Sequence, residues 1–291
     1  MKILVTGATS FIASALIDFL RGKHDVIALS SSNGEDYIYC KMEDYGSLPD
    51  IIDSRDIDVC IHFAWSGIKN QKNNYDIQHS NVVGTISLIN ALSVMNVKRF
   101  IGIGTIAEKE VINYHPYNHS VPRLNSMYGV CKLHAHFLSK MYCNELGIQY
   151  TWCTLANVYG PGDTTENFIK KAMSIINSDS RASFTEGKQL YDFIYIDDLI
   201  DALSLVIDFN KSESELYIGS GDPRPLFEYI EVIRDAINPS KSLYLGDIPY
   251  NNAFLKHQDY CIDDIVNLGF SPQTTFEEGL NKSLSWYLQL L

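Results

Sequence analysis

Short apolar runs alternate along the chain with longer segments in which apolar residues recur every three or four positions. The runs occupy residues 2–6, 25–29, 57–62 and 99–104, with a weaker one at 37–39, and the periodic segments occupy residues 10–20, 45–54 and 79–95. A short, continuously apolar run predicts a buried strand, and the three-to-four spacing predicts a helix. Strands that alternate with helices in this way predict an α/β fold, with a doubly wound parallel sheet covered by helices on both faces.

The length, composition and net charge of the chain limit the number of domains and the kinds of partner. The 291 residues, 46% of them apolar and 20% charged, suffice for one large domain or two ordinary ones around a sizeable core. The formal charge of −12 disfavours both a nucleic-acid partner and a membrane surface, because each attracts basic protein. We therefore expect no nucleic acid and no membrane as partners. A phosphate on a small molecule stays compatible with the charge, because helix N-termini bind phosphates locally.

The six cysteines are scattered, with no C-x-x-C pair, and several lie inside apolar runs, as buried free thiols do. This usage suits a reducing compartment better than a disulfide framework. No apolar run approaches the length of a membrane span. We expect a cytoplasmic protein without a metal site.

The segment Tyr128-Gly-Val-Cys-Lys132 carries candidate chemistry. A tyrosine and a lysine four residues apart on a helix lie on one face, one turn from each other. An ammonium so close to a phenol favours the phenolate, so we expect Lys132 to lower the pKa of Tyr128 toward working pH. Such a phenol can exchange a proton with a sugar-like hydroxyl.

The first strand, turn and helix carry a candidate dinucleotide site. In Thr6-Gly-Ala-Thr-Ser-Phe-Ile-Ala13 the chain would turn at Gly7 and aim the following helix N-terminus at a pyrophosphate. The glycine fingerprint is only partly met, because Ser10 and Ala13 stand where glycines are usual. Alanine is accepted at the third position, whereas serine at the second is a departure.

Several motifs occur in order along nearly the whole chain. They are Thr6-Gly-x-x-Ser-Phe-Ile-Ala13, Ile61-His-Phe-Ala64, Asn81-Val-Val-Gly-Thr85, Tyr128-x-x-x-Lys132, Asn157-Val-Tyr-Gly-Pro161 and Tyr191-Asp-Phe-Ile-Tyr-Ile-Asp-Asp198, followed by the tail Leu268-Gly-Phe-Ser-Pro272. Together they resemble the extended short-chain dehydrogenases/reductases, the NAD-dependent epimerase/dehydratase family that acts on nucleotide sugars. The resemblance implies a Rossmann-type sheet with a smaller C-terminal substrate-binding cap.

The resemblance also implies a role for each matching residue. A catalytic set of Thr105, Tyr128 and Lys132 would hold the substrate oxygen, exchange its proton and bind the cofactor ribose, respectively. The cofactor would contact Gly7, Ser10, Phe11, Ile12, Ser30, Ser31, Ala64, Tyr128 and Lys132. His62 ends a buried strand and is expected to be a hydrogen-bonded structural histidine rather than a base.

The end of the second strand bears on the choice between NAD and NADP. An acidic residue there would accept hydrogen bonds from the ribose 2′-hydroxyl and repel a 2′-phosphate. This chain has the neutral run Ser30-Ser-Ser-Asn33, with no arginine in that loop. The resemblance therefore implies NAD(P) as the cofactor, and the neutral loop leads us to expect a slight preference for NADP.

The resemblance places a nucleotide sugar against the cap. The substrate would meet Trp65, Thr105, Asn157, Asn167, Tyr191 and Lys256. The family often has an arginine before Asp-Phe and another near the C-terminal cap, where this chain has Tyr191 and Lys256. Arg224 is an alternative clamp for the diphosphate. An ammonium such as that of Lys256 cannot form the two parallel hydrogen bonds that an arginine guanidinium makes to phosphate, so this replacement is not conservative. The identity of the nucleotide therefore stays open.

The predicted domains follow the same resemblance. Residues 1–160 would form the dinucleotide-binding domain, with 186–215 returning to it, and residues 161–185 and 216–291 would form the cap. A homodimer through the helices near 81–95 and 126–145 is what the family suggests.

The preferred reaction is reduction of a nucleotide-linked 4-keto sugar, with Tyr128 as proton donor. A C4 epimerase would use the same residues and is the alternative. Dehydration is disfavoured because Ile106 and Ala107 follow Thr105, where dehydratases of the family place an acidic pair. A non-catalytic dinucleotide sensor is the third reading, favoured by the incomplete glycine fingerprint and opposed by the complete catalytic set.

Overall fold

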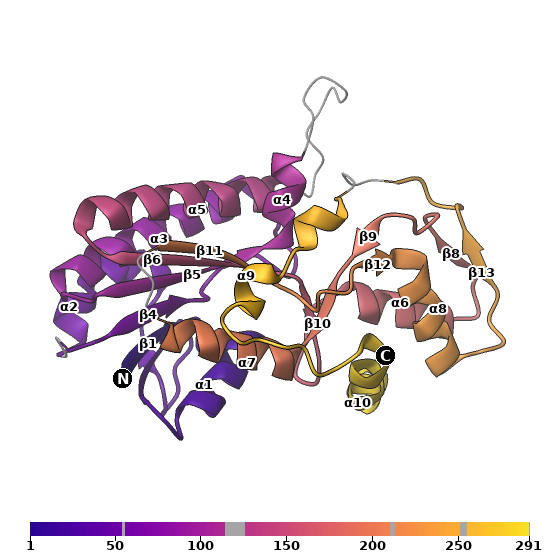
Figure 1. Ribbon diagram of the computed structural model, residues 1–291, viewed down its shortest axis with the longest axis horizontal. Helices are drawn as coiled ribbons and strands as arrows, with labels where there is room; N and C mark the ends of the chain where they lie inside the picture. The colour runs from indigo at the N-terminus through magenta and orange to yellow at the C-terminus, as the bar shows by residue number, and fades with distance from the viewer. Residues whose placement is uncertain (54–55, 114–125, 210–212, 251–254, 291) are drawn as a thin grey trace.

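The chain forms a seven-stranded parallel sheet with a smaller lobe at one end (Figure 1). The computed structural model describes residues 1–53, 56–113, 126–209, 213–250 and 255–290. In the order β11-β6-β5-β4-β1-β2-β3, the strands are Glu213–Ile218, Gln149–Leu155, Arg99–Thr105, Val59–His62, Lys2–Thr6, Asp25–Ser30 and Ile38–Tyr39. Every adjacent pair is parallel, and the order reverses direction beside β1, as in a Rossmann-type sheet. The predicted fold class is confirmed.

Helices cover both faces of the sheet (Figure 1). On one face lie α3 (Tyr75–Val94) and α5 (Ser126–Leu146), with the short α4 (Ile106–Ile112) beside them. On the other face lie α1 (Phe11–Leu20) and α7 (Ile196–Asp208). Two clusters of buried apolar side chains, one under each helical layer, account for the continuously apolar strands. None of the described helices combines the length and apolarity that crossing a membrane requires.

Two helices differ from their sequence-based bounds. The periodic segment at 45–54 forms a 3-10 helix, η1 (Met42–Ser47), followed by one α-helical turn, α2 (Leu48–Ile51). Pro49 lies in the first turn of α2, where its missing N–H is tolerated, so the segment divides into two short pieces. Helix α3 begins earlier than expected because Asn74 caps it, accepting a hydrogen bond from the Ile77 amide at 3.2 Å.

The smaller lobe follows β7 (Asn157–Tyr159), which pairs in parallel with β10 (Phe193–Tyr195). The lobe contains α6 (Phe168–Asn177), α8 (Leu226–Ile237), α10 (Phe276–Leu288) and the short strands β8 (Ala182–Phe184), β9 (Leu190–Tyr191), β12 (Arg224–Pro225) and β13 (Leu243–Leu245). The 3-10 helix η2 (His257–Tyr260) and α9 (Asp263–Val266) lead into α10. Strand β11 belongs to the main sheet up to Ile218, so the sheet includes residues that the sequence-based boundary at 215 assigned to the cap.

Candidate active site

The turn after β1 tolerates no side chain. Gly7 has φ +70°, a left-handed conformation that disfavours other residues, and a Cβ there would lie 2.7 Å from the Ala64 backbone nitrogen. Ser10 precedes the first turn of α1 without capping it, and Ser10, Phe11 and Ile12 line a cavity. A glycine turn that leads to uncapped helical N–H groups is the cradle a pyrophosphate requires, so these residues fit a dinucleotide.

A buried histidine supports this turn from behind. The Thr6 hydroxyl lies 2.8 Å from Nδ1 of His62, and the Thr85 hydroxyl lies 3.0 Å from Nε2. Burial, together with the charge of Lys132, lowers the pKa of His62 to about 3, so the ring is neutral at physiological pH. Both ring nitrogens are hydrogen-bonded, which confirms the expectation of a structural histidine.

Three side chains expected to act together meet at one wall of a cavity of about 550 Å³. Thr105 ends β5, and its hydroxyl hydrogen-bonds the phenol of Tyr128 on α5. Lys132 follows one turn later on α5, with its ammonium donating to the Ile103 carbonyl oxygen at 2.8 Å. The same ammonium lies 3.9 Å from the centroid of the Trp65 ring, which also meets the Tyr128 ring edge-on at 6.2 Å.

The expected lowering of the Tyr128 pKa is wrong for this geometry. Desolvation of the phenol raises its pKa to about 12, although the hydrogen bond from Thr105 acts in the opposite direction. Burial also lowers the pKa of Lys132, to about 7. Tyr128 is therefore protonated at physiological pH and is equipped to donate a proton.

The cap closes the opposite wall of this cavity. Residues lining it from the cap side include Asn157, Asp163, Thr165, Asn167, Phe168, Lys171 and Phe193. Asn167 caps α6 by accepting from the Lys170 amide at 2.8 Å, and its amide nitrogen donates to Asp163 and to the Tyr287 hydroxyl. The Asn157 amide donates to the Asp192 carbonyl oxygen at 3.1 Å. Both asparagines thus lie at the expected place, between the sheet and the cap.

A second, largely apolar cavity of about 260 Å³ lies within the cap. Its walls are Phe168, Lys171, Ala172, Ile175, Ser183, Phe184, Thr185, Gln189, Tyr191, Leu226, Ile230, Ile248 and Tyr250. Phe168 and Lys171 line both cavities, so the amino-terminal part of α6 separates them. Sequence reasoning missed Lys171, which lies outside every motif quoted above.

Tyr191, Lys256 and the alternative clamp Arg224 do not line the catalytic cavity. Tyr191 lines the cap cavity rather than the catalytic one and packs against Phe168 at a ring distance of 5.9 Å. Lys256 is not among the residues that line either cavity, and it precedes η2. Arg224 is engaged by Asp222 at 2.6 Å and Glu277 at 2.8 Å, so neither cation forms a clamp over the catalytic cavity.

The end of β2 carries the neutral serines as expected. Ser30 is buried, and its hydroxyl accepts from the Ser32 amide at 2.9 Å, whereas Ser31 is exposed. This loop offers hydroxyl and amide groups and no carboxylate between Ser30 and Asn33. Among the described residues, no three histidine, cysteine or acidic side chains gather into a group that could hold a metal ion.

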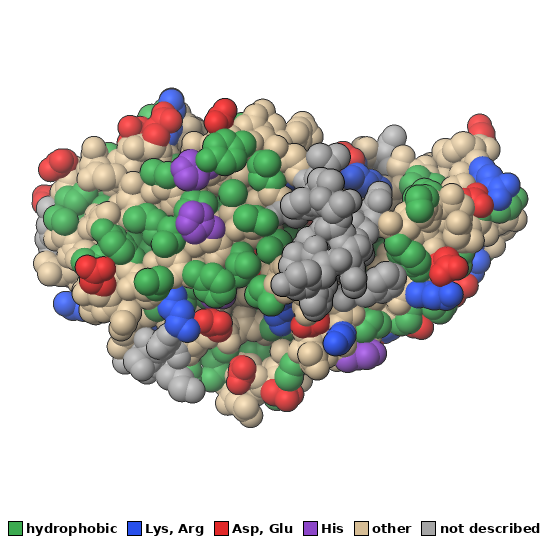
Figure 2. All heavy atoms as spheres, turned by 90° about the horizontal axis from the view of Figure 1, so that it is seen from above, with side chains coloured by type: hydrophobic (Ala, Val, Ile, Leu, Met, Phe, Trp, Pro, Cys, Tyr) green, Lys and Arg blue, Asp and Glu red, His purple; other side chains and the backbone are tan. Residues whose placement is uncertain are grey.

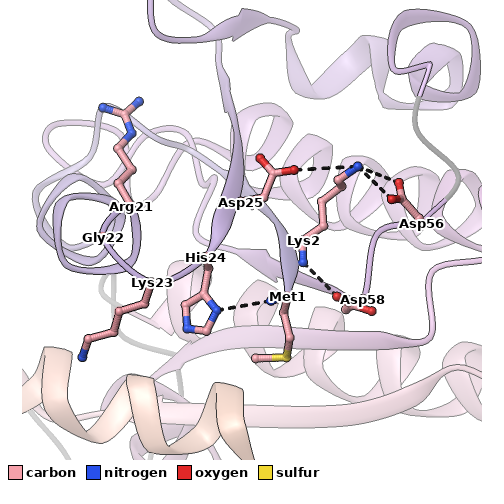
Figure 3. A pocket seen from close by; sticks show the side chains of 9 residues that line it. All are labelled: Met1, Lys2, Arg21, Gly22, Lys23, His24, Asp25, Asp56 and Asp58. Atoms are coloured by element: carbon pink, nitrogen blue, oxygen red, sulfur yellow. Dashed lines mark hydrogen bonds and ion pairs between the residues drawn. The ribbon is translucent and has the colours of Figure 1, made fainter.

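An open hollow of about 710 Å³ lies at the amino ends of β1 and β2 (Figure 3). Within it Lys2 pairs with Asp56 at 2.7 Å and with Asp25 at 3.7 Å, and the Lys2 amide donates to Asp58. Ligands of open parallel sheets bind at the carboxyl ends of the strands, where Gly7 and Thr105 lie. We interpret this hollow as a charged surface depression.

The sheet order, the glycine turn and the cavity beneath the cap define a Rossmann-type protein. The chain belongs to the NAD dependent epimerase/dehydratase family, whose model matches residues 3–219. It is 28% identical to a putative UDP-glucose 4-epimerase of Methanocaldococcus jannaschii, over 98% of this chain and 97% of that protein. It is 25% identical to the CDP-abequose synthase of Salmonella muenchen, over 98% and 97% of the two chains.

Solved structures share the same fold. The UDP-glucuronic acid 4-epimerase of Bacillus cereus, in complex with UDP-glucuronic acid and NAD, superposes with a TM-score of 0.79. The match covers 100% of each chain at 22% sequence identity. The chain is therefore an enzyme of the NAD dependent epimerase/dehydratase family, with the fold of the solved 4-epimerase.

Proposed function

We propose that this chain is an NAD(P)H-dependent reductase of a nucleotide-linked 4-keto sugar. The observation that carries the proposal is the phenol of Tyr128, hydrogen-bonded to Thr105 in a cavity between the glycine turn and the cap. When bound, NAD(P)H supplies the hydride. The protein supplies the proton and the orientation.

In this mechanism the substrate carbonyl oxygen lies between the Thr105 hydroxyl and the Tyr128 phenol. The threonine holds the oxygen, and the phenol donates its proton to it as the carbonyl carbon is reduced, so that a C=O group becomes CH–OH. The ammonium of Lys132, on the next helical turn, stabilises the phenolate left behind. Trp65 covers Lys132 and limits its access to water.

Reduction and epimerisation require opposite protonation states of Tyr128 at the start of the reaction. A reductase begins with a protonated phenol, whereas a C4 epimerase begins by removing a proton from the sugar hydroxyl and needs a phenolate. The pKa of Tyr128, raised to about 12 by desolvation, supports the first. Epimerisation is the second candidate, favoured by the likeness to a putative UDP-glucose 4-epimerase.

The test is a set of incubations with NADH or NADPH and a panel of UDP-, CDP- and dTDP-linked 4-keto sugars. Reduction consumes one cofactor per sugar, followed at 340 nm and by mass of the product. Interconversion of two sugars without net cofactor consumption would instead establish the epimerase. The neutral end of β2 leads us to propose tighter binding of NADPH than of NADH, measured by fluorescence titration of both.

The two adjoining cavities support a division of the substrate. The sugar would lie in the catalytic cavity, the base in the apolar cap cavity, and the diphosphate beside Lys171, which lines both. The pKa of Lys72 is lowered by desolvation and by repulsion from Lys171, and an anion near both ammonium groups would relieve that repulsion.

Lys171→Met is expected to raise the KM for the sugar nucleotide about tenfold, because an exposed charge-assisted contact to phosphate is lost. The value of kcat and the Kd for NADPH should stay within about threefold. Lys170→Met is the matched control, since that ammonium pairs with Glu166 at 2.7 Å. Equal KM values for the two variants would contradict the placement of the diphosphate.

We also propose a homodimer through α3 and α5. Hydrophobic side chains gather over the part of the surface where these helices lie (Figure 2). The exposed apolar residues there are Val83 and Val94 of α3 and Val130, Phe137 and Met141 of α5, and Met141 is 71% exposed. Residues spaced by seven and eleven share one helix face, so each helix presents its exposed apolar residues on a single face.

Phe137→Glu is expected to convert a dimer into a monomer, because a charge would be buried at the interface. Light scattering after size-exclusion chromatography measures the mass. Val266→Glu, an exposed apolar position on α9, is the control and should leave the mass unchanged. A monomeric wild-type protein would overturn the proposal.

A further inference from the structure

A carboxylate that sequence reasoning did not assign to the site lies directly behind the catalytic residues. Glu108 is on α4, and only 2% of it is exposed. It does not line the catalytic cavity. A buried carboxylate is costly unless several donors compensate for the lost water, so its partners indicate what it holds in place.

Those partners come from three separate elements. The Thr105 amide at the end of β5 donates to Glu108 at 2.8 Å, and Nδ1 of His136 on α5 donates at 2.9 Å. The indole nitrogen of Trp152 on β6 donates at 3.1 Å. One carboxylate thus joins the strand that ends in Thr105 to the helix that carries Tyr128.

The histidine in this cluster occupies a fixed position on the catalytic helix. His136 lies one turn after Lys132 and two turns after Tyr128 on α5, and its ring stacks on Trp152 at 4.7 Å. The packing leaves little free space, because a Cβ at Gly104 would lie 2.6 Å from the Glu108 carboxylate. Helix α5 therefore cannot slide along the sheet without breaking these contacts.

We propose that Glu108 is a positioning residue of the active site. Through the Thr105 amide and His136 it fixes the relative placement of the threonine hydroxyl and the phenol, so that both reach one substrate oxygen. This inference rests on the proposed function. The residue does not touch the substrate and acts through Thr105 and through α5.

The charge of Glu108 also affects the pKa values of Tyr128 and Lys132. It raises the pKa of Tyr128, in addition to desolvation and against the hydrogen bond from Thr105, and it raises the pKa of Lys132 against desolvation. Among the described residues, the Lys72 ammonium, 5.4 Å from the Tyr128 ring centroid, and neutral His62 beside Lys132 also face them. Removing the charge of Glu108 should therefore lower both pKa values.

The experiment compares Glu108→Gln with the wild-type protein. We expect kcat for keto-sugar reduction to fall about tenfold to 100-fold, with the KM and the Kd for NADPH within about threefold. The alkaline limb of the kcat profile should move to lower pH, because the phenol and the ammonium lose their protons earlier. Glu108→Asp keeps the charge and should restore the position of this limb, while kcat stays reduced because the shorter side chain cannot reach the Thr105 amide.

Hydrogen exchange supplies a readout independent of turnover. Peptides covering 103–109 should exchange faster in Glu108→Gln, while peptides of α1 stay unchanged. His136→Asn should reproduce part of the loss in kcat, and exposed His134→Asn on the same helix is the matched control.

The measurements distinguish failure of the positioning role of Glu108 from failure of the proposed reductase function. Faster exchange at 103–109 in a protein that reduces no keto sugar would leave the positioning role standing and overturn the proposed function. A Glu108→Gln variant with an unmoved alkaline limb and unchanged exchange at 103–109 would overturn the positioning role. So would a variant that merely melts at a lower temperature, with kcat and cofactor binding falling together.

Discussion

Tyr128→Phe is expected to lower kcat for keto-sugar reduction by about 1,000-fold, because it removes the proton donor and keeps the ring. The aromatic contact with Trp65 does not need the hydroxyl, so the fold should be retained. The KM for the sugar nucleotide and the Kd for NADPH should change by less than about threefold. Stopped-flow measurement of NADPH oxidation at saturating substrate gives kcat for both proteins.

Tyr142→Phe is the control for this change. Tyr142 lies on the same helix and packs against the apolar cluster beneath it, away from the cavity. Its hydroxyl has no part in the mechanism, so kcat should stay near the wild-type value. If Tyr128→Phe kept even a tenth of wild-type turnover, another group would have to supply the proton and the assignment would be lost.

Lys132→Met is expected to lower kcat about 100-fold, because the phenolate formed during the reaction loses the ammonium one helical turn away. In the wild-type protein this help should disappear as the pH rises through about 7, where Lys132 loses its proton. Below that pH the ammonium is present, and above it the neutral amine gives no charge stabilisation. The pH profile of kcat should therefore fall on the alkaline side in the wild-type protein and be flatter in the variant.

The same lysine predicts a change in stability with pH. Its pKa is lowered from 10.5 to about 7 by burial, so between these values the unfolded chain binds more protons than the folded one. Folding stability then rises with pH, and this residue contributes a gain of about 2 kcal/mol between pH 7 and pH 9. Lys132→Met should lack that gain, which urea unfolding at the two pH values measures.

Lys140→Met is the matched control, because this lysine lies on the same helix and pairs with Glu215 at 2.9 Å on the surface. Its removal should leave the pH dependence of stability as in the wild-type protein. Equal gains between pH 7 and pH 9 in Lys132→Met and in the wild-type protein would contradict the buried, half-neutral lysine.

The main sheet and the gathering of Thr105, Tyr128 and Lys132 could be predicted from the sequence, for physical reasons. A continuously apolar run such as 99–104 can be buried only between two helical layers, so strand and layer follow from one pattern. The spacing of Tyr128 and Lys132 fixes their shared helix face. Gly7 marks the turn because a left-handed backbone that touches Ala64 accepts no other residue.

The features of the site that could not be predicted from the sequence depend on contacts between segments far apart in the chain. The pKa of Tyr128 is raised mainly by burial of the phenol, and spacing on a helix does not report burial. The positions of Tyr191 and Lys256 depend on how the cap folds over the sheet. Glu108 forms a capping box with Thr105 at the start of α4, and its contact with His136 joins segments far apart in the chain, so no local pattern predicts it.

The amino-terminal part of α6 separates the catalytic cavity from the cap cavity, and this arrangement has an evolutionary consequence. Residues such as Ser183, Phe184 and Ile248 wall the chamber in the cap and are not among those that border the reacting groups. If the base lies in this cavity as proposed, substitutions at these positions would change which nucleobase is accepted and leave the proton-transfer residues intact. Related enzymes with this fold could thus change the nucleotide they recognise and the reaction they catalyse independently.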